Sequence, residues 1–272
     1  MSTMKIGCGT VSFRRYPLVD ALKAIRNAGY EYFETQAQGS FCPHVDVKKD
    51  DPQKFQKLAQ DLGFKGITGL WSTDGALIKA DNCVENVCLC LEWAQAAGIP
   101  CVFLGDGPKP PEISDQQAWA IIESRLQPIL ETAAKTGVKI AIEPHGAFTV
   151  TSQGLLKILA LGTPETLGVN YDTANVHNAT FGQNPWQHKP GFDEIDVLKS
   201  VADSVIHCHV KDYSNGKSCT PGTGIAKVAQ CLDILKNSGY TGAISLETEG
   251  EHDFQQAEQI AKDAFKFLAK WG

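Results

Sequence analysis

A short phrase recurs along this chain and limits the folds that it can adopt. In its clearest copies, NAGYEYFE, AAGIPCVFL and KTGVKIAIE, a helical pattern is followed by a glycine and then by β-forming residues. DLGFKGITG and NSGYTGAISLE are similar copies. A glycine in this place ends a helix in the left-handed conformation. The phrase therefore predicts helix-to-strand junctions at Gly29, Gly63, Gly98, Gly137 and Gly239.

The spacing of these glycines predicts the number of strands. The first four are 34, 35 and 39 residues apart, and the gap of 102 residues before the last holds about three more units. Eight units of about 34 residues, each the size of a strand–helix module, fill the 272 residues of the chain. We therefore predict an α/β fold, a single (β/α)8 TIM barrel over residues 1–272. The expected strands are Lys5–Thr10, Tyr30–Gln36, Lys65–Leu70, Cys101–Leu104, Lys139–Pro144, Leu167–Asp172, Val205–Lys211 and Ala243–Glu247.

The segments between the expected strands show helical periodicity. Apolar residues at helical spacing include Leu18, Ala21, Leu22 and Ile25; Ile122, Leu126, Ile129 and Ala133; Ile225, Val228, Leu232 and Leu235; and Ile260, Ala261, Ala264, Phe265 and Leu268. The Pro-containing segments Asp106–Pro111 and Gln183–Pro190 each follow a strand, so we expect loops there rather than an interdomain linker. A doubly wound open sheet is the alternative. It is disfavoured because Gly7–Gly9 lacks the third glycine of the dinucleotide fingerprint.

Composition excludes several other classes of protein. No apolar run reaches the ~18–20 residues of a membrane span, and the start MSTMKIGCGT lacks a signal-peptide pattern. The net charge of −6 argues against nucleic-acid binding, which needs clustered Lys and Arg. The nine cysteines have irregular spacings, which favours buried thiols over a disulfide framework. We therefore expect a cytoplasmic protein without membrane or nucleic-acid partners.

Polar residues end four successive strands on the side opposite their apolar, helix-facing residues. Each of these polar residues lies two positions after a residue of the same strand, and therefore on the same face. The pairs are Ala141 and Glu143, Asn170 and Asp172, His207 and His209, and Ser245 and Glu247. In a barrel, that face points inward, and the ends of the strands form the mouth that carries active sites. Three converging carboxylates would repel one another unless a cation lies between them. We therefore predict a divalent metal bound by Glu143, Asp172, His209 and Glu247, with Mn²⁺ the first choice and Mg²⁺, Co²⁺ and Zn²⁺ as alternatives.

The phrases IEPHG, VNYDTAN, HCHVKD, PGTG and ISLE, in this order, resemble those of the sugar isomerase/epimerase barrels related to xylose isomerase, D-tagatose 3-epimerase and inosose dehydratase. The resemblance implies a (β/α)8 fold and a metal on the same four residues. It also implies that Glu143 and Glu247 move protons on the two faces of the substrate, as an acid/base pair. A dimer or tetramer is a further expectation from the resemblance.

The chain departs from this family at two places near the expected site. Many members have a His three residues after the metal-binding Asp, where this chain has Asn175, and His177 follows two residues later. We expect one or both to contact substrate. Epimerases of free ketohexoses have an Arg shortly after the metal-binding His, but this chain reads KDYSNGKS there. These differences argue against a simple ketohexose 3-epimerase.

Such a site supports removal of a proton next to a carbonyl, because a metal stabilises the enediolate that forms. The sequence therefore predicts a metal-dependent isomerase or epimerase acting on a sugar or keto-sugar. Loss of a leaving group from the same intermediate would instead give a lyase, either an inosose-type dehydratase or a 3-keto-glycoside eliminase. Two further alternatives are an apurinic-site endonuclease, disfavoured by charge and by missing ligands, and a non-catalytic barrel.

Further candidates surround the predicted metal ligands. His145 and Lys211 lie just past strand ends, where each could act on substrate as a catalytic or binding group or anchor a loop. Glu34 is a weaker candidate for substrate contact, and Trp71 and Phe148 are candidates for an apolar wall. His207 lies deeper, where we expect a core or supporting role. The glycines of Pro221–Gly224 suggest a tight turn more than a phosphate cradle, because no basic cluster accompanies them.

Overall fold

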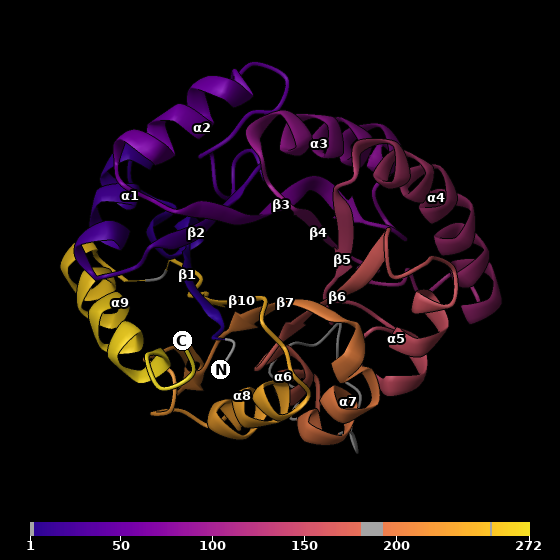
Figure 1. Cartoon of the computed structure of the whole chain (residues 1–272). Helices are drawn as coiled ribbons and strands as arrows, with labels where there is room; N and C mark the ends of the chain where they lie inside the picture. The colour runs from indigo at the N-terminus through magenta and orange to yellow at the C-terminus, as the bar shows by residue number, and fades with distance from the viewer. Residues whose placement is uncertain (1–2, 181–192, 251) are drawn as a thin grey trace.

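The computed structural model describes residues 3–180, 193–250 and 252–272. Eight parallel strands close into a barrel in the order β1-β10-β7-β6-β5-β4-β3-β2 (Figure 1). Every predicted strand overlaps one of them, so the predicted (β/α)8 barrel is confirmed. The third strand runs six residues beyond its predicted end, to Ala76. The strands are β1 Lys5–Gly9, β2 Tyr32–Gln36, β3 Gly66–Ala76, β4 Cys101–Gly105, β5 Lys139–Ile142, β6 Leu167–Asp172, β7 Val205–Val210 and β10 Ala243–Leu246.

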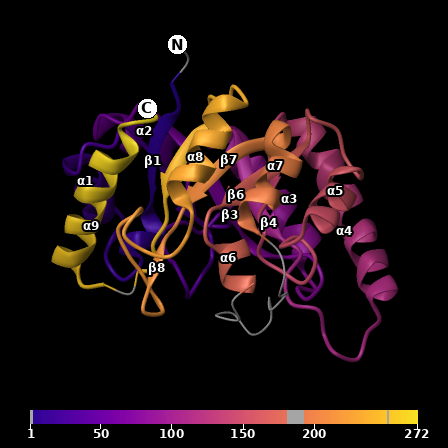
Figure 2. The same ribbon diagram turned by 90° about the horizontal axis from the view of Figure 1, so that it is seen from below.

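Helices surround the barrel as an outer ring (Figure 1). A two-stranded hairpin, β8 Tyr213–Ser214 with β9 Lys217–Ser218, follows β7. Figure 2 shows β8 and α6 at the end of the barrel opposite to the N-terminus. This end, where the parallel strands finish, is called the mouth below. The helices are α1 Leu18–Asn27, α2 Pro52–Asp61, α3 Cys83–Ala97, α4 Asp115–Thr136, α5 Ser152–Leu159, α6 Asn175–Thr180, α7 Glu194–Val201, α8 Val228–Asn237 and α9 Phe254–Leu268.

Local sequence signals set the ends of these helices. Ser114 and Gln117 form a reciprocal capping box at the start of α4, which satisfies two backbone amides that have no helical partner. Gly98 and Gly137 end α3 and α4 with φ of 72° and 70°. Side chains with a Cβ rarely adopt this conformation, so glycine is favoured there. All five glycines of the repeated phrase have positive φ, as the sequence predicted.

Apolar side chains form two separate clusters. The larger one fills the space between strands and helices, where Leu70, Leu104 and Val169 are fully buried. The smaller one lies inside the barrel and consists of Trp71, Cys101, Phe103 and Ala141, with Ile206 packed against it. This inner cluster supports the polar residues that lie nearer the mouth.

Two irregularities in strand pairing change which side chains point inward. On β3, Thr68 and Gly69 together lie opposite Glu34, and on β7 Ile206 is an extra residue between the pairs formed by Val205 and His207. Strict alternation along β7 would assign Ile206 to the helix-facing side, together with Cys208 and Val210. That assignment is wrong, because the extra residue turns Ile206 toward the inner cluster.

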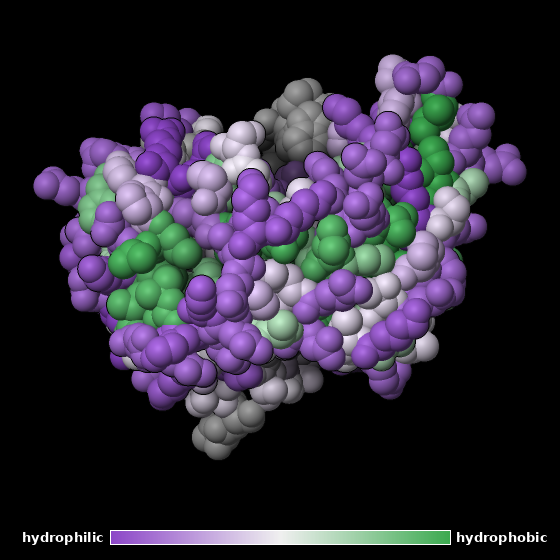
Figure 3. Space-filling model, turned by 90° about the horizontal axis from the view of Figure 1, so that it is seen from above, coloured by the Kyte–Doolittle hydropathy of each residue, from purple (hydrophilic) through white to green (hydrophobic). Residues whose placement is uncertain are grey.

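The outer surface differs from expectation at one helix. Ile225 was predicted to begin the apolar stripe before the eighth strand, but α8 begins at Val228 and Ile225 is 47% exposed. On the face shown in Figure 3, hydrophobic residues form patches interrupted by hydrophilic ones. No helix among the described residues has the length and apolar character needed to cross a membrane. The loop predicted at Gln183–Pro190 lies outside the described residues.

Candidate metal centre and active site

The four predicted metal ligands lie together at the mouth. Asp172 ends β6, His209 lies near the end of β7, and Glu143 and Glu247 directly follow β5 and β10. One ligand atom from each residue lies within 4.8 Å of those of the other three. All four residues are at most 5% exposed. The alternation of neighbouring strands therefore brings three carboxylates and one imidazole to one point.

Hydrogen bonds from neighbouring residues fix two of these carboxylates, those of Glu143 and Asp172. Asn170 Nδ2 donates to Glu143 Oε2 at 2.7 Å, and Asn175 Nδ2 donates to Glu143 Oε1 at 2.9 Å. Asp172 Oδ1 accepts from the backbone amides of Ala174 and Asn175, at 2.7 and 2.8 Å. The positions of the Glu143 and Asp172 carboxylates are therefore determined by the protein's own groups.

Lys211 lies beside two of the predicted ligands. Its Nζ is 3.1 Å from Asp172 Oδ2, 2.6 Å from Glu247 Oε2 and 2.8 Å from Glu249 Oε1. Burial disfavours a charged ammonium, but Asp172, Glu247 and Glu249 together raise the pKa of Lys211 well above its ordinary value. Lys211 is therefore a fixed positive charge at the edge of the candidate metal centre.

The electrostatics of the centre fit a divalent cation. Asp172 Oδ2 and Glu247 Oε2 are buried and accept no hydrogen bond from the residues that the structure describes, although Lys211 Nζ is within ion-pair distance of both. Burial raises the pKa of Glu247 to about 8, against the opposing charges of His209 and Lys211. Burial likewise opposes a charged His209, yet Glu247, Glu34 and Glu143 raise its pKa well above the ordinary value. Such a surplus of carboxylate charge with mixed O and N donors is what a divalent metal binds.

A cavity of about 980 Å³ opens above the centre. Its walls include four predicted site residues besides Trp71: Glu143, His145, Lys211 and Glu247. The remainder of the wall comes mainly from the extended end of β3 and from residues 38–41. The Trp71 and His145 rings meet edge to face, with centroids 5.7 Å apart. These two rings and the candidate metal centre therefore face a common space that is large enough for a sugar.

Other predicted substrate contacts are not among the described residues that line this cavity. Asn175 lies behind Glu143, and His177 Nδ1 lies 3.0 Å from Glu194 Oε1. Phe148 packs against Trp119, with ring centroids 4.9 Å apart. These three residues therefore support neighbouring elements in the structure.

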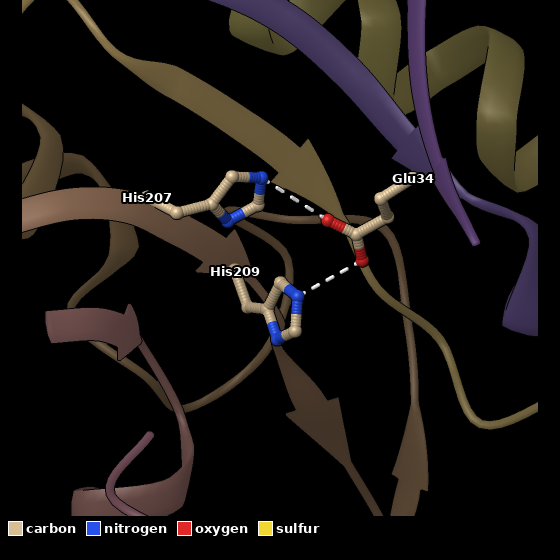
Figure 4. A group of neighbouring side chains, drawn as sticks. All are labelled: Glu34, His207 and His209. Atoms are coloured by element: carbon tan, nitrogen blue, oxygen red, sulfur yellow. Dashed lines mark ion pairs between the residues drawn. The ribbon is translucent and has the colours of Figure 1, made fainter. Parts of the chain in front are cut away.

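Glu34 was also predicted to contact substrate, but it lies below the candidate metal centre and is 1% exposed. Its Oε1 is 2.9 Å from His209 Nε2, and its Oε2 is 3.3 Å from His207 Nε2 (Figure 4). His207 is buried deep in the barrel, where desolvation lowers its pKa to about 3 despite the nearby Glu34 carboxylate. His207 is therefore a neutral core histidine, in line with the supporting role expected for it.

The turn at Pro221–Gly224 does not form a phosphate cradle. The backbone amides of Gly222 and Gly224 donate to Asp212 Oδ2, at 2.9 and 2.8 Å. Asp212 Oδ1 accepts from the amides of Tyr213 and Ala226. The amides that could have bound an anion are thus occupied by Asp212, and the turn is a structural one.

Three residues of the site were missed at the sequence level. Glu249 follows Glu247 by one strand pleat, so the ETE alternation could have indicated it. Asn170 occupies the inward face of β6 one pleat below Asp172. Asp106 is fully buried and binds the loop that carries His145: it accepts from Phe148 N at 2.6 Å and from Thr149 Oγ1 at 2.5 Å. Asp106 gave no sequence signal, because its partners are 42 and 43 residues away.

Comparison with known proteins identifies relatives by sequence. A family model described as a xylose isomerase-like TIM barrel matches residues 22–271. An uncharacterised protein of Methanocaldococcus jannaschii is 28% identical over 152 residues, 53% of this chain and 48% of that protein. An inosose dehydratase of Lacticaseibacillus casei is 21% identical over 178 residues, 58% of this chain and 56% of that enzyme. The chain thus spans about half the length of the curated relatives it matches.

Solved structures resemble the whole chain. A structure of L-ribulose 3-epimerase superposes with a TM-score of 0.78 at 17% identity, and covers 98% of this chain and 94% of its own. A structure of the IolI protein with a bound zinc atom has a TM-score of 0.75 at 18% identity, and covers 99% of both chains. At these identities the likeness establishes the barrel fold.

Proposed function

Because the chain belongs to the xylose isomerase-like TIM barrel family, we propose that it is a divalent-metal-dependent isomerase or epimerase of a sugar or keto-sugar. The observation that carries the proposal is the convergence of Glu143, Asp172, His209 and Glu247 under a cavity of about 980 Å³. The sugar epimerase among the structural neighbours supports this class of reaction.

The reaction requires a proton to leave a carbon next to a carbonyl and to return to the other face or to the neighbouring carbon. A cation held by the four ligands would stabilise the negative charge that develops on the substrate oxygens. In this proposal the proton is taken by Glu143, whose two oxygens accept from Asn170 and Asn175. Glu247, which lines the same cavity, holds a proton on the other side of the substrate and returns it in this proposal. In the reverse direction the two roles exchange.

Lys211 and His145 are the proposed substrate-binding groups, because both line the cavity beside the two glutamates. Lys211 offers an ammonium to a substrate oxygen, and its pairing with Glu247 and Glu249 keeps it charged. His145 offers an imidazole from a loop that Asp106 holds in place. Trp71 supplies an apolar wall for the carbon face of a sugar ring.

Deuterium exchange tests this proposal. The protein is stripped of metal with a chelator, reloaded with Mn²⁺ and incubated with keto-sugars in D₂O, and the substrate is followed by NMR. We expect deuterium at the carbon next to the carbonyl, no exchange without metal, and loss of exchange in Glu143→Gln and Glu247→Gln. The matched control is Glu131→Gln, which replaces an exposed glutamate on α4. Full activity of the metal-free protein would contradict the proposal.

A lyase is the second candidate. The inosose dehydratase relative favours it, as does His145, which lines the cavity and could protonate a leaving group. The same experiment separates the two reactions. An epimerase or isomerase exchanges carbon-bound hydrogen and keeps all its substituents, whereas a lyase releases water or an alcohol.

The proposal also covers the metal, the cellular compartment and the partners of the enzyme. Mn²⁺ is the proposed metal, since three carboxylates and one imidazole form a predominantly hard ligand set. We propose that the protein works in the reducing cytoplasm, where its nine free cysteines would stay reduced. The proposed partner is a small sugar, and the chain is proposed to act as a dimer or tetramer.

A further inference from the structure

Glu34 forms a bridge between two histidines on the opposite side of the barrel. Glu34 comes from β2, and His207 and His209 are successive inward residues of β7 (Figure 4). All three residues are at most 1% exposed. Glu34 is thus a buried carboxylate that contacts one predicted metal ligand and does not face the cavity.

The chain makes room for this carboxylate at Gly9. A Cβ at position 9 would lie 2.9 Å from Glu34 Oε1. The φ of Gly9 is −71° and its ψ is 132°, a conformation open to any residue. Backbone geometry therefore does not require glycine there, whereas the position of Glu34 does.

The hydrogen-bond directions around Glu34 can be assigned from Asn170. Asn170 Nδ2 donates to the Glu143 carboxylate, so Asn170 Oδ1 is the atom 2.9 Å from His207 Nδ1. An amide oxygen only accepts, and therefore His207 carries its proton on Nδ1. Its Nε2 lies 3.3 Å from Glu34 Oε2 and 3.2 Å from Thr68 Oγ1.

His209 is oriented by the same carboxylate. Glu34 Oε1 lies 2.9 Å from His209 Nε2, and a carboxylate can only accept from that nitrogen. The other ring nitrogen, Nδ1, lies 2.8 Å from Glu143 Oε2 and 3.4 Å from Glu247 Oε2, among the predicted metal ligands. A proton kept on Nε2 leaves the Nδ1 lone pair available to a metal.

We propose that Glu34 is a positioning residue, which holds His209 in the tautomer and orientation that present Nδ1 to the metal. The inference rests on the proposed function, because it presumes a metal at this centre. A carboxylate that accepts from the outer nitrogen of a metal-binding histidine also makes the imidazole a stronger ligand, and loss of such a partner typically weakens metal binding 10–100-fold.

The wild-type protein provides the first test. Its histidines are labelled with ¹⁵N, the protein is titrated with Zn²⁺, and ring tautomers are read from ¹⁵N–¹H correlation spectra. We expect His209 to be metal-bound through Nδ1 and protonated on Nε2, and His207 to be protonated on Nδ1. Metal on Nε2 of His209 would overturn the inference.

Variants provide the second test, with Mn²⁺ affinity and stoichiometry measured by calorimetry. Glu34→Ala should weaken binding about 10–100-fold. Glu34→Gln should weaken it less, because the amide oxygen still accepts from His209 Nε2. Gly9→Ala leaves the carboxylate in the chain but displaces it, and should also weaken binding. The matched control is Glu31→Ala, which removes a partly exposed glutamate paired with Lys65.

The outcomes separate this inference from the proposed function. Unchanged affinity in Glu34→Ala and Gly9→Ala, or equal losses in Glu34→Ala and Glu34→Gln, would overturn the positioning role. Two ions per wild-type chain, with one lost in Glu34→Ala, would overturn it too, and would assign Glu34, His207 and His209 to a second metal site. If the wild type binds no divalent cation, the proposed metal centre itself fails.

Discussion

Lys211 Nζ lies 2.6 Å from Glu247 Oε2, so a lysine ammonium and a predicted metal ligand form a buried ion pair. The same nitrogen reaches Asp172, a second predicted ligand. Lys211 therefore balances part of the negative charge that a divalent metal would balance. Metal and lysine are expected to stabilise the same carboxylates.

Lys211→Met should destabilise the metal-free protein by about 3–5 kcal/mol, because it leaves buried carboxylates without their cation. Mn²⁺ should recover part of this loss. Thermal unfolding with and without Mn²⁺ measures both effects, and the increase in Tm on adding metal should be larger in the variant. Equal increases in variant and wild type would show that Lys211 and the metal do not share these carboxylates.

Asn175→Ala should lower kcat about tenfold, the equivalent of about 1.4 kcal/mol, with little change in KM. The reason is that Asn175 Nδ2 donates to Glu143, and it is not among the described cavity-lining residues. Steady-state kinetics on the substrate found by deuterium exchange checks this, with the exposed Asn237→Ala as control. A raised KM at unchanged kcat would instead support the substrate contact that the sequence suggested.

Asp106→Ala should lower the free energy of unfolding by about 1–3 kcal/mol. It leaves the buried Phe148 amide without its acceptor, whereas the Thr149 hydroxyl keeps the Glu143 carbonyl oxygen 3.1 Å away as an acceptor. Urea denaturation measures the change. Asp61→Ala is the contrast: it removes an exposed ion pair with Lys57 and should cost less than about 0.5 kcal/mol. Similar values for the two variants would contradict the supporting role of Asp106.

Cysteine reactivity should follow burial. Seven of the nine free cysteines are buried, and Cys88 and Cys219 are partly exposed. Burial raises the pKa of the Cys90 thiol to about 11 and those of Cys42 and Cys83 to about 12, so their thiolates are scarce at pH 8. A thiol reagent should modify at most two cysteines quickly in the native protein and all nine in denaturant. Rapid native modification of more than two would contradict the burial described.

The barrel and the candidate metal ligands could be predicted from the sequence because both depend on short-range patterns. Helix-ending glycines mark five of the eight units, and strand alternation has a fixed period of two, so Glu143, Asp172, His209 and Glu247 could be assigned to one face. The metal itself stays a prediction, as does the extent of the domain over residues 1–272.

Contacts across the barrel and the directions of loops could not be predicted from such short-range patterns. Glu34 contacts histidines more than 170 positions away, and the irregularity in β3 opposite it has no signature in the alternation. Asn175 and His177 follow Asp172 closely, but α6 begins at Asn175 and directs them to Glu143 and Glu194. Pairing across long sequence distances decides such positions.

Inside the barrel, two glycines each lie against a large side chain of the neighbouring strand. A Cβ at Gly69 would lie 1.9 Å from the Phe103 ring, and one at Gly168 would lie 2.7 Å from Ile206. Each pair combines a residue without a side chain and a large residue on the neighbouring strand. Neither member can change size freely while the other stays fixed. Positions 69 and 103, and likewise 168 and 206, are therefore expected to covary during evolution. The summed side-chain volume of each pair should stay nearly constant.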